Sequence, residues 1–240
     1  MGRVRGGVAA VPAHAVAAAA LQRGDGGADR DDGVRPALRG SAAVILGLIP
    51  VELAVFVFAG LFSPGPNVVL LTASGARFGF RATVPHVLGV AAGVGVTAGL
   101  TGLGLGALLL AYPALTLALR LVAAGWILWL AWKLFRATRT SRAEAGDRPF
   151  TFIEAVAFQW VNPKVWAVAL AASAFVATRG PAEAGAALAI AFSCINLGVC
   201  LFWSSAGHLL GRLLSDERLW RAFMTGMAAL MAASAALIFA

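Results

Sequence analysis

The sequence predicts an all-α polytopic membrane protein with six transmembrane helices in two three-helix halves, in which helices 1 and 4 are interrupted by proline. The first observation is composition: of 240 residues, 60% are apolar and only 12% are charged. Water-soluble domains contain about 25% charged and about 45–50% apolar residues. The second is that the apolar runs have the length a bilayer requires, about 20 residues. The surface of this chain must therefore face the lipid bilayer.

Six apolar segments account for the chain after its first 50 residues. Short stretches, most of which contain basic residues, separate them. The predicted membrane segments are Val51–Ser74, Val84–Leu110, Tyr112–Phe135, Phe150–Val176, Ala184–Leu210 and Trp220–Ala240.

The first segment contains two prolines around a glycine, in the run Ser63-Pro64-Gly65-Pro66-Asn67. Proline lacks an N–H and clashes with the preceding helical turn, so this run cannot continue an ordinary helix. At membrane depth the freed backbone groups must be satisfied by protein or by water in a cavity. We therefore expect a broken helix beside a polar pathway.

The fourth segment carries a second break, Asn162-Pro163-Lys164. A lysine inside an apolar segment costs about 2.5–3.5 kcal/mol on insertion scales and is a functional candidate. Paired breaks at corresponding places in two halves are typical of secondary transporters, where they form the binding site. Freed backbone groups could hold a small zwitterion such as an amino acid. The predicted substrate-binding residues are Pro64, Gly65, Pro66, Asn67, Asn162, Pro163 and Lys164.

Glycines of the second segment recur four residues apart, as at Gly89 and Gly93 or Gly95 and Gly99. This spacing lets helix backbones approach closely. It suits packing within one chain and equally suits the interface of a homodimer.

The basic residues predict the orientation of the chain. They gather in the connections after the first, third and fifth segments, so these loops are expected in the cytoplasm and both termini outside. The net charge of +8 comes from these short loops, and nucleic-acid binding is not expected.

Residues 1–42 differ from the rest, being rich in Ala, Gly, Arg and Asp without a long apolar run. We expect a disordered or misannotated extension there. Residues 43–240 are predicted to form a single transporter domain.

Ser63-Pro64-Gly65-Pro66-Asn67, Gly79, Gly89-x-x-x-Gly93 and the run Phe158–Lys164 together resemble the LysE/RhtB family of amino-acid exporters, named for lysine and homoserine/threonine efflux. The resemblance covers roughly residues 51–240. It implies a six-segment inner-membrane exporter of amino acids or related metabolites that is driven by proton exchange. Such an exporter is not an enzyme and needs no cofactor.

Two alternative functions are weaker. Export of a metal cation would require clustered Asp, Glu, Cys or His, which the apolar segments lack. A thiol-disulfide electron carrier needs two close cysteines. Cys194 and Cys200 lie six residues apart on different faces of one helix and are expected to be buried small hydrophobes.

Two further charged residues lie in the apolar segments. Glu154 is expected at a solvated helix start, and the role of Arg120 is left open.

Overall fold

The computed structural model describes residues 49–136, 148–214, 216–236 and 238–239, and every regular element within them is helical. The extension predicted at residues 1–42 therefore lies outside the described residues. In chain order the elements are α3 (Val51–Phe62), α4 (Pro66–Phe78), α5 (Phe80–Leu100), a π-helical turn (Thr101–Leu105), α6 (Gly106–Ala111), α7 (Pro113–Arg136), α8 (Phe152–Trp160), α9 (Pro163–Ala172), a 3₁₀ turn (Ser173–Val176), α10 (Pro181–Leu213) and α11 (Glu217–Ala236).

Three described helical stretches are long and apolar enough to cross a membrane, namely Phe80–Leu105, α7 and α10. A fourth crossing results if α3 and α4, which meet at an angle of 60°, are counted as one bent span. The prediction of an all-helical membrane protein is thus confirmed, and the described residues contain three or four candidate membrane spans. The count of six remains a prediction, because α8 and α9 are individually short.

Proline and glycine fix the places where these helices begin and turn. Pro66 and Pro163 occupy the first positions of α4 and α9, where a missing N–H costs nothing. Gly79 joins α4 to α5 with a φ of 83°, a left-handed conformation that favours glycine. Across the first of these prolines, α3 and α4 meet at an angle of 60°.

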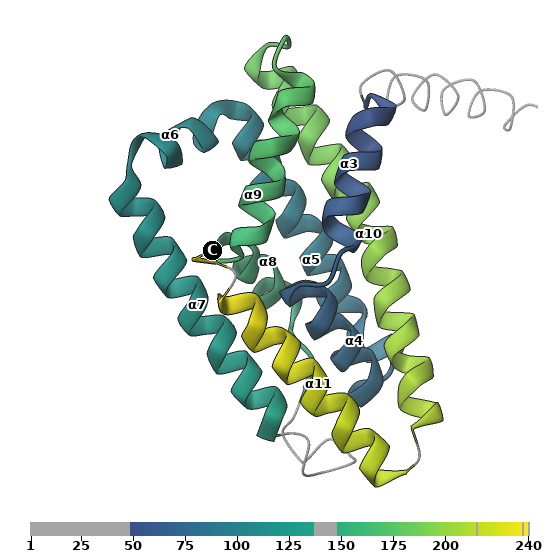
Figure 1. Ribbon diagram of the computed structural model, residues 1–240. Helices are drawn as coiled ribbons and strands as arrows, with labels where there is room; N and C mark the ends of the chain where they lie inside the picture. Colours follow the sequence, from purple (N-terminus) through teal and green to yellow (C-terminus); the bar gives the residue numbers. More distant parts are fainter. Residues whose placement is uncertain (1–48, 137–147, 215, 237, 240) are drawn as a thin grey trace, which may run out of the picture. The chain divides into compact units, whose positions relative to one another are not determined.

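Helix α5 packs on α8 and α10, and α10 packs in turn on α4 (Figure 1). The glycines of α5 make these contacts possible. A Cβ on Gly93 would lie 2.7 Å from the Gln159 Cγ on α8, and one on Gly99 would lie 3.0 Å from the Ala189 Cβ on α10. These glycines therefore serve packing within the chain, and the homodimer stays a prediction without support from them.

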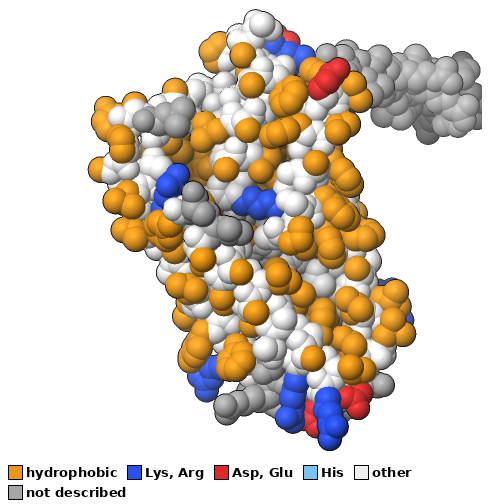
Figure 2. Space-filling view, in the orientation of Figure 1, with side chains coloured by type: hydrophobic (Ala, Val, Ile, Leu, Met, Phe, Trp, Pro, Cys, Tyr) orange, Lys and Arg blue, Asp and Glu red, His pale blue; other side chains and the backbone are white. Residues whose placement is uncertain are grey.

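Helices α7 and α11 run side by side, drawn in teal and yellow in Figure 1. Their shared core includes Ile127 and Leu130 of α7 with Met224 and Met231 of α11, and it extends to Phe158 of α8. Many exposed side chains of α7 are large and apolar, and hydrophobic side chains are spread over the face seen in the space-filling view (Figure 2). Such a surface is suited to lipid.

The cysteines are free, but only one matches its expected environment. Cys200 is buried, as predicted, whereas Cys194 is exposed on the outer face of α10. A helix in lipid can present a small apolar side chain outward without penalty, which is why sequence alone did not separate the two positions.

Candidate functional site

The break between α8 and α9 lies against the break between α3 and α4. Lys164, in the first turn of α9, reaches across and its Nζ donates three hydrogen bonds: to the Ser63 O at 2.5 Å, the Ser63 Oγ at 2.9 Å and the Pro64 O at 3.3 Å. An ammonium group has three donors. Lys164 therefore satisfies the backbone oxygens freed by the first break.

Gly65 allows this close approach. A Cβ added at Gly65 would lie 2.9 Å from the Lys164 Cδ and 3.1 Å from its Nζ. A side chain at this position would therefore shift the flexible end of Lys164 relative to the oxygens it contacts. Glycine is favoured here by contact rather than by backbone conformation.

The second break is closed by a tryptophan. The Trp166 Nε1 donates to the Trp160 O at 3.0 Å, so the last carbonyl of α8 also has a partner. At each break, hydrogen bonds within the protein thus satisfy at least one freed carbonyl oxygen, as a membrane environment requires.

A cavity of about 630 Å³ lies beside the two breaks. It contains six of the seven predicted substrate-binding residues, the exception being Asn67. Residues of α7 and of the C-terminal end of the chain complete its wall. The polar or positively charged side chains on this wall belong to Thr116, Arg120, Asn162, Lys164 and Ser234.

Asn67 instead faces α8. Its Nδ2 donates to the Gln159 Oε1 at 2.8 Å, and the Gln159 Nε2 donates back to the Asn67 Oδ1 at 3.3 Å and to the Ala155 O at 2.8 Å. Gln159 is fully buried. This residue was not predicted as part of the site, although an amide inside an apolar run is a signal that could have identified it.

Asn162 caps α9 and is 1% exposed, yet its Oδ1 has no hydrogen-bond partner among the described residues. Since it lines the cavity, this oxygen is an acceptor available to a bound molecule. Buried polar atoms without partners are rare, and each calls for an explanation.

Arg120, Thr116 and Ser234 line the cavity but were not predicted as site residues. The Thr116 Oγ1 and Ser234 Oγ each donate to a carbonyl of their own or the adjoining helix, Leu109 O at 2.6 Å and Met231 O at 2.7 Å. Arg120 stands alone in an apolar helix, and its isolation was the available signal.

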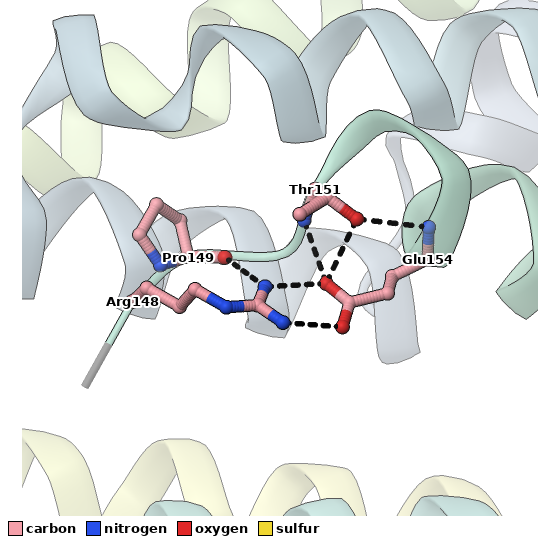
Figure 3. A network of polar contacts seen from close by, with 4 residues as sticks. All are labelled: Arg148, Pro149, Thr151 and Glu154. Carbon is pink, nitrogen blue, oxygen red and sulfur yellow. Dashed lines mark hydrogen bonds and ion pairs between the residues drawn. The ribbon is translucent and has the colours of Figure 1, made fainter. Parts of the chain in front are cut away.

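Glu154 lies outside the cavity and caps α8, as Figure 3 shows. Its carboxylate accepts from the Thr151 N at 2.8 Å, while the Arg148 guanidinium donates to both of its oxygens at 2.6 and 2.7 Å. The expectation of a solvated helix start is confirmed.

A cavity with a few polar groups beside the ends of short helices, in an apolar helical chain, is typical of a membrane transporter. Residues 58–239 match the LysE type translocators, and the chain belongs to that family. It is therefore a transporter and not an enzyme.

Among its relatives, the cysteine/O-acetylserine efflux protein of Salmonella choleraesuis is 32% identical over 155 residues, which cover 62% of this chain and 77% of the relative. The protein of the same name from Escherichia coli O1:K1 is 31% identical over 156 residues, covering 63% and 78%. No solved structure matches the chain.

Proposed function

We propose that this protein is a secondary transporter that exports amino acids or related small metabolites from the cytoplasm through the cavity beside its two helix breaks. The observation that carries the proposal is the contact of Lys164 with Ser63 and Pro64, since it joins two interrupted helices next to a cavity that has polar groups on a largely apolar wall. Secondary transporters place their solute at such breaks. Efflux of cysteine and O-acetylserine by the named relatives supports a zwitterionic solute.

The bound solute would contact Pro64, Gly65, Pro66, Asn162 and Pro163 directly, and Lys164 would hold the two breaks together beside it. Asn67 would act through Gln159, whose amide lies one helical turn before the second break. Free acceptors and donors on the wall suit both charges of an amino acid.

The test is export from loaded vesicles that contain the purified protein, with labelled cysteine, O-acetylserine, serine, glutamate and lysine. Lys164→Ala should abolish export while the protein still reaches the membrane. Lys133→Ala is the matched control, because Lys133, the other lysine of the chain, lies over the Trp129 ring at the end of α7. Wild-type export rates from Lys164→Ala would refute the assignment.

Six membrane crossings in two halves fit this function, with α3–α4 as the first span and α8–α9 as the fourth. The basic connections after α4, α7 and α10 support cytoplasmic placement of these loops and external termini. Figure 2 shows Lys and Arg side chains gathered at its lower end. A C-terminal reporter enzyme that is active only outside the cytoplasm should therefore be active.

Proton exchange is the proposed driving force, on the strength of the family resemblance. Export from vesicles should then depend on an imposed pH gradient and stop when a protonophore collapses it. Export that continues unchanged under those conditions would overturn the coupling but not the transport.

Export of a metal cation is less well supported. Among the described residues no three His, Cys, Asp or Glu side chains gather where they could hold a metal ion. The cavity is instead lined by two cationic side chains, which repel a cation.

A further inference from the structure

Among the described residues that line the cavity, two have cationic side chains, and one of these two is available to bind a solute. All three donors of the Lys164 ammonium group already point to oxygens of the first helix break. A solute could recruit Lys164 only if one or more of these hydrogen bonds broke. Lys164 is thus a positioning residue in this conformation.

Arg120 is the other cation. Neither a hydrogen bond nor an ion pair joins its guanidinium to another residue in the described part of the chain. It lies seven residues after the start of α7 and sixteen before its end, about 10 Å and about 24 Å along the helix axis. Neighbouring side chains of α7 are apolar, so the guanidinium is an unpaired charge on an apolar span beside a cavity, where such groups are functional by default.

Asn162 supplies a second, independent sign of a ligand. Its Oδ1 is an acceptor without a partner, and the residue is 1% exposed and lines the same cavity. A guanidinium fork is suited to a carboxylate, and a carbonyl oxygen is suited to an ammonium group. One wall thus offers a free anion-binding group and a free cation-accepting oxygen.

The cavity also lacks a group for a second positive charge. None of the described residues that line it is Asp or Glu. A solute with a basic side chain would bring its extra cation next to Arg120 and Lys164 without a compensating carboxylate. Neutral and acidic amino acids avoid this repulsion.

We propose that Arg120 binds the carboxylate of the exported solute, that the Asn162 Oδ1 accepts a hydrogen bond from its ammonium group, and that the cavity therefore selects neutral or acidic amino acids over basic ones. This inference rests on the proposed function and names the substrate class of the same cavity. It assigns the anion-binding role to Arg120, whereas the sequence pointed to Lys164.

The experiment uses the full chain in vesicles and measures export of serine, O-acetylserine, glutamate and lysine. Wild-type protein should export at least one of the neutral or acidic amino acids, and its export of lysine should not exceed the background rate. For the neutral amino acid exported fastest, Arg120→Gln should raise the apparent KM at least about tenfold, and Arg120→Lys should restore part of the affinity because it keeps the charge but not the fork. Arg136→Gln, a change on the same helix outside the cavity, should leave KM unchanged.

A measurement on the wild type guards against misfolded variants. The methyl ester of the exported amino acid keeps the ammonium group and loses the carboxylate, so it should not compete for export. Competition by the ester, unchanged KM in Arg120→Gln, or preferred export of lysine would overturn the inference and leave the transport function standing. Background rates for every amino acid in the wild type would overturn the proposed function and this inference with it.

Discussion

Asn67 of α4 and Gln159 of α8 exchange a pair of hydrogen bonds across 92 positions of sequence, with Nδ2 to Oε1 at 2.8 Å and Nε2 to Oδ1 at 3.3 Å. One residue follows the first helix break and the other precedes the second. The amide pair therefore joins the two interrupted regions through a second contact besides that of Lys164.

Removal of either amide should destabilise the protein. Asn67→Ala leaves the fully buried Gln159 with an unpaired oxygen, at an expected cost of about 1–3 kcal/mol. In a double-mutant cycle with Gln159→Ala, the coupling energy should be about 0.6–1.7 kcal/mol, the range found for hydrogen bonds between membrane helices. Reversible unfolding in mixed micelles measures these values, and strictly additive effects would show that the pair does not couple the helices.

The contact between α4 and α10 depends on glycine, and a matched pair of substitutions tests this. A Cβ on Gly207 would collide with the Thr72 O, whereas a Cβ on Gly198 of the same helix would meet nothing within 4 Å. Gly207→Ala should therefore cost about 1–3 kcal/mol through overpacking. Gly198→Ala should stabilise the helix by about 0.5–1 kcal/mol. Equal unfolding free energies for the two variants would contradict the packing argument.

Proline and lipid-compatible composition made much of the helical plan predictable from sequence. Proline acts locally, and α4 and α9 begin at Pro66 and Pro163, the residues that were expected to break the helices. Glycine spacing similarly indicated close packing along α5. It did not identify α8 and α10 as the partners, because spacing within one helix contains no information on which surface covers it.

The site was less predictable, since its contacts join residues far apart in the chain. The hydrogen bond from the Lys164 Nζ to the Ser63 O spans 101 positions of sequence. Because of this contact, the ammonium group already has an acceptor within the protein. Arg120 was visible only as an isolated charge. Helix α7 is apolar on all sides, so no periodic pattern showed which face would line the cavity.

The cap of α8 should contribute to stability and not to transport. Glu154→Ala removes the carboxylate that accepts from the Thr151 N and from Arg148, with an expected loss of about 1 kcal/mol. Glu217→Ala, which removes an exposed pair with Arg221 at the start of α11, should cost less than about 0.5 kcal/mol. Vesicle export by Glu154→Gln should match the wild type, and its loss would mean that this carboxylate carries a proton after all.

Replacing both cysteines with serine should leave export unchanged. Cys194 and Cys200 are free thiols on one helix, one exposed and one buried, so no disulfide chemistry joins them. Vesicle export at the wild-type rate from the double variant is the expected result. Loss of export with intact membrane insertion would favour the thiol-disulfide alternative.

The turn between α5 and α7 offers a test of backbone conformation without steric contact. Gly104 has a φ of 110°, and a Cβ there would meet nothing within 4 Å. Gly104→Ala should thus destabilise the protein by about 1–2 kcal/mol, purely because an L-residue is strained in a left-handed conformation. Gly125→Ala on α7, which is equally uncrowded but helical, should be neutral or stabilising. If Gly104→Ala were as stable as Gly125→Ala, the turn would relax to another conformation at no cost, and the bend that separates α7 from α5 would not be fixed by this glycine.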